Sequence, residues 1–259
     1  MLNFSGVPDK GLLGRVIRLP LRLIPNEAEV RILQGPLRGR RWIAGSSNHG
    51  CWLGSYEAVK QSKLIAFVRP GMTCWDVGAN AGFYTLLFAE LVGPLGKVFA
   101  FEPLPTNVRR LQRHVEMNSY HNVRIIASAL GDFDGDTGFD LGPSTLMGHL
   151  AHDGPLTVRC SRADSLLASG VAEAPDIIKI DIEGAEVAFL KGAPQTMKTL
   201  PMVFLATHGP AEHRTSLDLL AQYGYHTTAL NGGPAQETDE LMAVADRPTK
   251  LDTSDLPGA

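Results

Sequence analysis

A glycine-rich turn at residues 76–82 has the residue types best suited to bind a ligand. It reads Asp76-Val77-Gly78-Ala79-Asn80-Ala81-Gly82 and follows an apolar stretch, which predicts a buried strand that breaks into a turn and opens a helix. Gly78 and Gly82 permit positive φ and close approach of the backbone. The free amides at the start of the next helix attract an anionic group. The turn therefore indicates a site for a nucleotide-like ligand.

The spacing of these glycines discriminates between two such ligands. A dinucleotide site reads G-x-G-x-x-G, with an acidic residue about 20 positions further on and a pyrophosphate on its amides. This turn lacks the three-glycine pattern. It suits a smaller anion, such as an amino-acid carboxylate, better than it suits two phosphates.

A carboxylate ends the next predicted strand. Residues 97–101 are followed by Glu102, which can there accept hydrogen bonds from both hydroxyls of a ribose. A ribose combined with an amino-acid carboxylate describes S-adenosylmethionine. The turn residues expected to bind this cofactor are Gly78, Asn80 and Gly82. Asp76 would supply negative charge near the ammonium group of the cofactor, directly or through water.

Two further polar residues end predicted strands and could act on a methyl acceptor. Ligands in open α/β sheets bind outside the carboxyl ends of the strands, where Asp181 and His208 are expected. A hydroxyl acceptor must be held in line and must lose its proton. His208 is the natural general base by its ordinary pKa, and Asp181 is suited to orient the acceptor or carry its proton. A strand-end histidine also occurs simply as a hydrogen-bonded loop residue.

Glu183 and Glu186 follow Asp181 closely and have two explanations. At the start of the next helix, carboxylates are favoured by the helix dipole, which accounts for them without catalysis. Together with Asp181 they could instead form an oxygen-rich site for Mg²⁺.

The adenine is expected near residues that follow another strand. Ala129 and Leu130 come directly after an apolar stretch and are predicted to flank the ring. Asp132 could reach the adenine edge. It could equally stabilise the turn at 131–135, because Asp and Gly are ordinary turn formers.

Segments outside these strand ends could complete the site. Tyr56 and Glu57, upstream of the glycine-rich turn, could close over the donor or line the acceptor pocket. The stretch 142–153 contains His149 and His152 and is expected to be a loop, either an acceptor lid or plain surface.

Strands and helices alternate as a parallel sheet requires. Strands are expected around Trp75 and over 97–101, 123–128, 156–159, 176–181, 202–207, 225–230 and 240–245. Helices are expected from Gly82 to the Gly93-Pro94 stop, after Glu102 with Thr106 as its cap, and over 211–223. Upstream, 29–33 and 40–44 predict a hairpin around Gly35-Pro36.

The chain is expected to hold one α/β domain with an extension. We predict an amino-terminal extension over 1–70, a catalytic domain over 71–246 and a disordered tail over 247–259. Residues 11–24 are apolar with interspersed Arg and are broken at Pro20, too interrupted for a signal peptide or a membrane span. They predict a short helix that covers the core, or one that lies on a membrane surface or a partner.

Composition narrows the function classes. The 259 residues carry a formal net charge of −3, without the broad basic surface that nucleic-acid binding requires. Cys51, Cys74 and Cys160 are few and scattered, which argues against a disulfide framework or a zinc site and favours a reducing cytoplasm.

Four motifs resemble those of the FkbM-type S-adenosylmethionine-dependent methyltransferases, in the order of that family. They are residues 76–85, the tetrapeptide at 100–103, Ser128-Ala129-Leu130-Gly131-Asp132, and residues 178–186. With the upstream segments at 35–39 and 53–57, the resemblance spans roughly residues 28–230. It implies a class I, Rossmann-like methyltransferase with a mostly parallel sheet, helices on both faces, and a hydroxyl of a sugar or other small metabolite as acceptor. His208 departs from the family pattern, which more often has Glu after that strand.

Two rival functions share these features. A nicotinamide-dependent oxidoreductase, NAD(P)-linked, would share the sheet and the ribose carboxylate, but needs pyrophosphate glycines that this turn lacks. A regulatory module could keep the cofactor fold without turnover, if the extension or the 142–153 loop blocked the acceptor pocket. The sequence names no acceptor and no oligomeric state.

Overall fold

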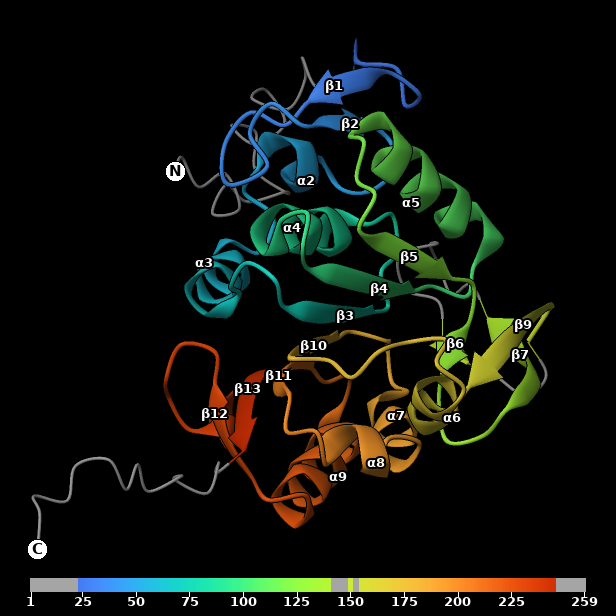
Figure 1. Cartoon of the computed structure of the whole chain (residues 1–259), viewed down its shortest axis with the longest axis vertical. Helices are drawn as coiled ribbons and strands as arrows, with labels where there is room; N and C mark the ends of the chain where they lie inside the picture. The colour runs from blue at the N-terminus through green and yellow to red at the C-terminus, as the bar shows by residue number, and fades with distance from the viewer. Residues whose placement is uncertain (1–22, 141–148, 151–153, 246–259) are drawn as a thin grey trace, which may run out of the picture.

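A seven-stranded sheet forms the centre of the molecule. The computed structural model describes residues 23–140, 149–150 and 154–245 (Figure 1). The strand order is β12-β13-β11-β10-β3-β4-β5. The strands are β3 (Thr73–Val77), β4 (Lys97–Phe101), β5 (Val123–Ile126), β10 (Ile177–Ile180), β11 (Met202–Ala206), β12 (Tyr225–Ala229) and β13 (Glu240–Ala245). All neighbours pair in parallel except β13, which is antiparallel to both β11 and β12. The mostly parallel, Rossmann-like sheet predicted from the sequence is confirmed.

Helices cover both faces of this sheet, as predicted (Figure 1). The helices α3 (Ala58–Phe67), α4 (Phe83–Val92) and α5 (Pro105–Met117) share one hydrophobic core. The helices α6 (Ala163–Ala168), α7 (Glu186–Lys191), α8 (Pro194–Met197) and α9 (Pro210–Gln222) share the other. Because successive side chains of a strand point to opposite faces, Cys74 packs in the first core and Trp75 in the second. Among the described helices, none is both long and apolar enough to cross a membrane.

The strand order places a ligand site at one edge of the sheet. After β4 and β5 the chain crosses back to add β10 on the other side of β3. Such a reversal opens a crevice at the carboxyl ends of the adjacent strands. The turn after β3 and the residues after β4 and β10 meet at that edge.

A smaller sheet follows β5. The strand expected at 123–128 ends at Ile126, because the Ser128 amide bonds back to the Ile126 carbonyl and turns the chain into a separate short strand, β6 (Ala129–Leu130). The order of this sheet is β6-β9-β7-β8. Its other strands are β7 (Gly135–Asp140), β8 (His149–Leu150) and β9 (Leu156–Ser161). The last was predicted over 156–159 and runs two residues further.

The amino-terminal segment packs on the main domain. The predicted hairpin is confirmed as β1 (Glu29–Arg31) and β2 (Arg41–Ile43), with Val30 opposite Trp42. A short helix, α2 (His49–Leu53), and α3 follow it. Residues on both sides of position 70 share one hydrophobic core, so the predicted boundary there stays a prediction. Residues 1–22 and 246–259, which contain most of the predicted amino-terminal helix and the whole predicted tail, lie outside the described residues.

Two helix starts differ from the prediction. Thr106 does not cap α5, because Pro105 already occupies the first helical position, where its fixed φ suits the helix. Glu183 does not lie in α7. It sits three residues before that helix in a left-handed turn, with φ of 50°.

Candidate active site

The glycine-rich turn between β3 and α4 is shaped by contacts that exclude side chains. Gly78 has φ of 76° and Gly82 has φ of 97°. A Cβ on Gly78 would lie 1.9 Å from the carbonyl oxygen of Asp181, and one on Gly82 would lie 2.3 Å from Leu111 Cδ1. Asn80 also adopts positive φ, 50°, and its Oδ1 accepts a hydrogen bond from the Ala81 amide at 2.7 Å. The turn therefore packs closely against the end of β10 and against α5.

Glu102 faces this turn from the end of β4. Its Oε2 accepts a hydrogen bond from the Asn80 amide at 2.8 Å. Its Oε1 accepts bonds from the Leu104 amide at 3.0 Å and from Asn107 Nδ2 at 3.3 Å. Burial raises the pKa of Glu102, and these donors oppose that effect. The carboxylate lines the pocket with lone pairs still available, as a ribose ligand requires.

Apolar residues line the pocket beside Glu102. Ala129 and Leu130 are buried there with Leu104 and Phe139, beside the partly buried Ile182. The contact of Ala129 and Leu130 with an adenine stays a prediction. Asp132 is exposed and lies outside the lining, so its position does not support a contact with the adenine edge.

Asp76 lies one layer behind the pocket. Its side chain is fully buried, and its Oδ2 accepts a hydrogen bond from Thr85 Oγ1 at 2.6 Å. Its Oδ1 lies 3.2 Å from Lys179 Nζ, which donates to the Gly78 carbonyl at 2.9 Å. Asp76 is not among the residues that line the pocket. The geometry therefore gives Asp76 a positioning role, through Lys179 on the turn, and not the direct contact with the cofactor that was one of the two predictions.

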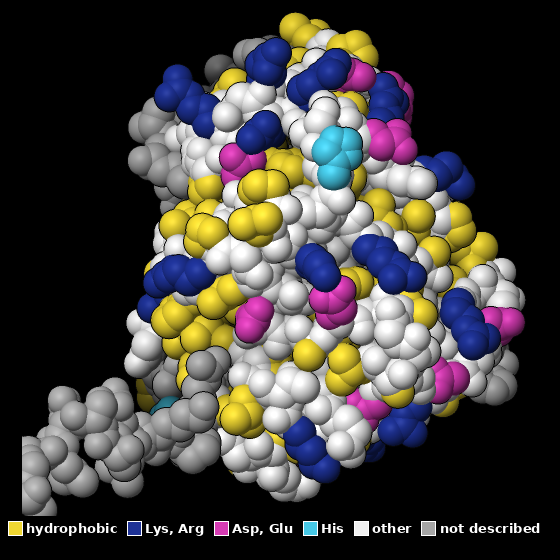
Figure 2. Space-filling model, in the orientation of Figure 1, with side chains coloured by type: hydrophobic (Ala, Val, Ile, Leu, Met, Phe, Trp, Pro, Cys, Tyr) yellow, Lys and Arg dark blue, Asp and Glu magenta, His cyan; other side chains and the backbone are white. Residues whose placement is uncertain are grey.

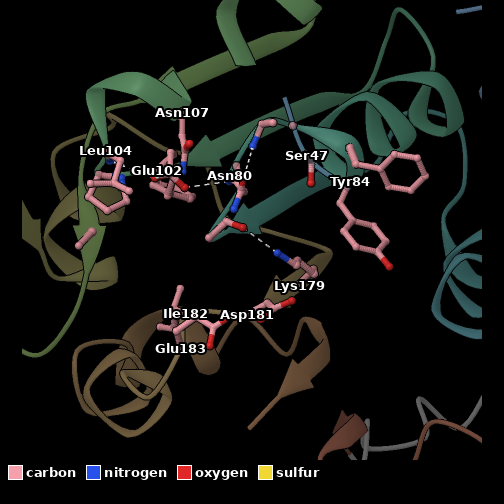
Figure 3. Close-up of a pocket in the computed structure, with 18 of the residues that line it drawn as sticks. Ser47, Asn80, Tyr84, Glu102, Leu104, Asn107, Lys179, Asp181, Ile182 and Glu183 are labelled. Carbon is pink, nitrogen blue, oxygen red and sulfur yellow. Dashed lines mark hydrogen bonds between the residues drawn. The ribbon is translucent and has the colours of Figure 1, made fainter. Parts of the chain in front are cut away.

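These elements line one pocket, which is partly open to solvent. Figure 3 shows Asn80 and Glu102 on one side of it, facing Asp181, Ile182 and Glu183 on the other. The groups that line the pocket fit S-adenosylmethionine. A carboxylate is available for the ribose, an apolar wall for the adenine and a polar turn for the amino-acid group. The wall across from Glu102 carries Asp181 and Glu183 and is therefore acidic.

His208 and Asp181 come together at this acidic wall. His208 Nε2 lies 3.7 Å from Asp181 Oδ1 and 3.5 Å from Glu183 Oε2. Its Nδ1 is 2.9 Å from Glu186 Oε1, whose side chain is fully buried. The hydrogen bond to Glu186, with the charges of the three carboxylates and against partial burial, raises the pKa of His208 to about 9. His208 is therefore protonated near neutral pH, which disfavours the predicted role of general base.

The predicted Mg²⁺ ligands are rearranged in the structure. Asp181, Glu183 and His208 each offer one ligand atom, and these atoms lie within 4.8 Å of one another. Glu186 instead holds the opposite nitrogen of His208. The candidate metal set therefore contains a histidine in place of Glu186.

Of Tyr56 and Glu57, the two extension residues predicted to reach the site, only Tyr56 lines the pocket. Tyr56 lines the pocket and packs edge-on against Phe83, with ring centroids 5.4 Å apart. Glu57 stands behind it with φ of 43° and accepts a hydrogen bond from the Tyr84 hydroxyl at 2.6 Å. Only Tyr56 of the two could touch a bound molecule. Of the predicted loop, His152 lies outside the described residues, and the His149 backbone is part of β8.

Several lining residues were not singled out from the sequence. They are Trp42, Ser47, Asn48, Cys51, Tyr84 and Lys179. Lys179 could have been found from the sequence, because it is the one charged residue in the buried strand β10 and such a residue needs a partner. No sequence pattern marks the residues of the extension, since their approach to the pocket depends on tertiary packing.

The chain is similar in sequence to known methyltransferases. Residues 76–227 match the family described as the methyltransferase FkbM domain. The hexuronic acid methyltransferase AglP of Haloferax volcanii is 28% identical over 150 residues, which cover 57% of this chain and 61% of the relative. The 2-O-methyltransferase NoeI of Sinorhizobium fredii is 25% identical over 181 residues, covering 60% of this chain and 73% of the relative.

Among solved structures, a methyltransferase FkbM from Methylobacillus flagellatus aligns with a TM-score of 0.48 and 19% identity. The alignment covers 67% of this chain and 43% of that one.

Proposed function

Because the chain belongs to the FkbM methyltransferase family, we propose that it transfers a methyl group from S-adenosylmethionine to a hydroxyl of a sugar or another small metabolite. The observation that carries the proposal is the pocket in which Glu102 and the glycine-rich turn face Asp181. The names of the relatives AglP and NoeI, a hexuronic acid methyltransferase and a 2-O-methyltransferase, support a sugar hydroxyl as acceptor.

The residues at the Glu102 side bind the donor in this proposal. Glu102 accepts hydrogen bonds from the ribose hydroxyls, Ala129 and Leu130 flank the adenine, and the Gly78–Gly82 turn receives the amino-acid group. S-adenosylmethionine, when bound, supplies an electrophilic methyl group. The protein contributes by holding the reactants in line, which can account for about 7 to 11 kcal/mol of a barrier.

Asp181 acts on the acceptor in this proposal. Its carboxylate lines the pocket and is about a fifth exposed, so it can accept a hydrogen bond from the acceptor hydroxyl and take its proton. His208, held by Glu186, is a cation beside Asp181 and Glu183. We assign it the role of orienting the Asp181 carboxylate.

A metal ion at Asp181, Glu183 and His208 is the second arrangement that the geometry favours. It requires His208 to lose a proton, after which the buried Glu186 would orient the ring for a metal on Nε2. Turnover after chelation separates the two arrangements. Activity that survives EDTA supports proton transfer to Asp181 alone, whereas loss of activity that Mg²⁺ restores supports the metal.

The rival functions differ from this proposal at defined points. An oxidoreductase would need pyrophosphate contacts that the turn at 78–82 does not provide. An acceptor pocket blocked by the extension or by the 142–153 loop would favour a non-catalytic module. Within the described part of the chain, the extension leaves the pocket partly open to solvent. We further propose that the protein works in a reducing cytoplasm, as its three scattered cysteines suggest.

Calorimetric titration tests the donor. Wild-type protein is titrated with S-adenosylmethionine, S-adenosylhomocysteine and NAD in parallel. We expect saturable binding of the two methionine-derived ligands and a clear preference for both over NAD. Saturable binding of NAD alone would overturn the proposal.

A cofactor-dependent screen of sugars and other hydroxylated metabolites, read by mass spectrometry, identifies the acceptor. Once one is found, Asp181→Asn should lower kcat at least about 100-fold, far more than it changes cofactor affinity. Full activity in that variant would mean that Asp181 is not the acceptor residue, although the methyltransferase function would stand.

A further inference from the structure

Lys60 is a buried lysine that the amino-terminal extension carries to the edge of the active site. It belongs to α3, and its side chain is 4% exposed. A buried ammonium group is costly unless it is paired. The partners of Lys60 therefore explain why this position holds a charge.

Three carboxylates from three separate segments surround Lys60. Its Nζ lies 2.7 Å from Glu57 Oε2, just before α3, and 2.8 Å from Glu240 Oε1, at the start of β13. It lies 3.9 Å from Oδ2 of Asp181, after β10. Burial alone would lower the pKa of Lys60, but the carboxylates of Asp181, Glu57 and Glu240 outweigh it and raise that pKa. The lysine stays a cation and ties the extension to Asp181.

The other buried cation near Asp181 is engaged elsewhere. Lys179 pairs with Asp76 and donates to the Gly78 carbonyl. Both lysines approach the ring of Tyr84, with Nζ 5.7 Å (Lys60) and 5.5 Å (Lys179) from its centroid. The Tyr84 hydroxyl donates to Glu57. The Tyr84 ring therefore lies between two cations with different partners. Lys179 contacts the glycine-rich turn, and Lys60 contacts the acidic wall.

We propose that Lys60 is a positioning residue that fixes the Asp181 carboxylate at the pocket wall and offsets part of its charge. This inference rests on the proposed function, because it assigns the charge at Asp181 to the part of the pocket where the methyl group is transferred. It also gives the extension a role in the site that residues 71–246 cannot supply. The affinity for a ligand with a positive sulfonium should therefore depend on Lys60, because Lys60 offsets part of the negative charge of Asp181.

The ratio of two binding constants tests the proposal without an acceptor. S-adenosylmethionine carries a positive sulfonium, whereas S-adenosylhomocysteine is neutral at the same atom. Lys60→Met removes the cation and keeps the apolar stem. It should increase the preference for S-adenosylmethionine over S-adenosylhomocysteine by about three- to ten-fold in calorimetric titrations. Asp181→Asn should shift the same ratio in the opposite direction.

Matched variants separate this effect from a structural role. Lys63→Met removes a partly exposed cation one turn along α3 and should leave the ratio unchanged. Lys60→Arg keeps the charge and should hold the ratio near that of the wild type. If Lys60→Met does not fold, Glu240→Gln serves instead. It removes a competing carboxylate, so Lys60 offsets Asp181 more fully and the preference for S-adenosylmethionine should fall.

The outcomes distinguish the two proposals. If wild-type protein binds neither ligand, the proposed function fails first. If wild type binds both, and Lys60→Met, or Glu240→Gln in its place, leaves the ratio unchanged, the inference about Lys60 is wrong. An equal loss of affinity for both ligands, with a lowered melting temperature, would likewise reduce Lys60 to a structural residue.

Discussion

Two pairs of oppositely charged residues join separate segments at this site. Asp76 of β3 pairs with Lys179 of β10, and the two residues are direct neighbours in the register of the sheet. His208, which follows β11, pairs with the buried Glu186 at the start of α7. Because an unpaired charge in the interior is strongly destabilising, each pair fixes the distance between the segments that carry it. The shape of the pocket follows from these pairs.

At the scale of single residues, the sharpest prediction concerns Glu102. Glu102→Ala should weaken S-adenosylmethionine binding by about 1 to 3 kcal/mol, because the ribose hydroxyls lose a charge-assisted acceptor. Calorimetry measures the change. Glu116→Ala, which removes an exposed carboxylate from α5, is the matched control and should bind as wild type. A folded Glu102→Ala variant with wild-type affinity would show that Glu102 is not the ribose ligand.

His208 carries a second prediction at this scale. Its pKa is raised to about 9, chiefly by the hydrogen bond to Glu186. Its positive charge therefore stabilises the folded protein fully below about pH 6.5, and this contribution is lost as the pH rises through 9. In an NMR titration, Glu186→Gln should lower the pKa of His208 toward 6.5. If the pKa of His208 is already near 6.5 in the wild type, the imidazole is available as a base at neutral pH.

Whether the sequence predicts such a residue depends on whether the residue lies in a recognisable sequence pattern. Glu102 and Asp181 end predicted strands, so the rule on ligand sites in open sheets finds them. Lys60 lies in a segment without a strong pattern, and its role follows only from the meeting of Glu57, Glu240 and Asp181 in space. Asp76 belongs to the recognised motif, but only the structure shows that Lys179 separates it from the pocket.

At the scale of elements, regular strands were predictable and irregular connections were not. The central strands β3, β4, β10 and β11 are mostly buried and apolar, and the bounds predicted for strands of the large sheet agree with the structure within two residues. The separate strand β6 was not predicted, because it depends on a local backbone turn at Ser128 and on the pairing of Ala129 with the distant Cys160 of β9. The helices α2 and α3 have no strong amphipathic pattern, so tertiary packing defines them.

The contact between β2 and α5 yields a prediction on pH and stability. His114 of α5 is fully buried, stacks on Trp42 at 3.8 Å, and bonds to the Ala81 carbonyl at 2.7 Å. Its Nε2 accepts the Ile43 amide at 3.0 Å, which requires a neutral ring. Burial lowers the pKa of His114 to about 4, although the bond to Ala81 opposes it.

Since the unfolded chain binds this proton near pH 6.5 and the folded chain near 4, stability is lost as the pH falls through that window. Between pH 7.5 and 5 the loss from His114 should be about 2 kcal/mol. Urea denaturation at the two pH values measures it. His114→Gln should flatten the dependence, whereas the exposed His226→Gln should keep it. Equal slopes in wild type and His114→Gln would contradict the assignment.

At the scale of the whole molecule, the extension and the catalytic domain form one core. Ile32, Trp42 and Leu64 from the extension are buried with Leu87 and Leu111 of the main domain. Pairing of Lys60 with Asp181 adds a charged link between the two parts. The boundary predicted at residue 70 therefore separates segments of sequence that are joined by buried contacts.

The last prediction follows from this shared core. A truncated chain of residues 71–259 exposes the apolar face of α4 and α5 that Trp42 and Leu64 cover, and each large buried side chain contributes about 1.5 to 3 kcal/mol. Since whole domains are stable by only about 5 to 15 kcal/mol, the truncated chain should lose its cooperative thermal transition in circular dichroism. Removal of residues 247–259, the predicted disordered tail, is the control and should leave the melting temperature unchanged. A cooperative transition in the 71–259 chain would instead establish the boundary at residue 70 as that of an independent domain.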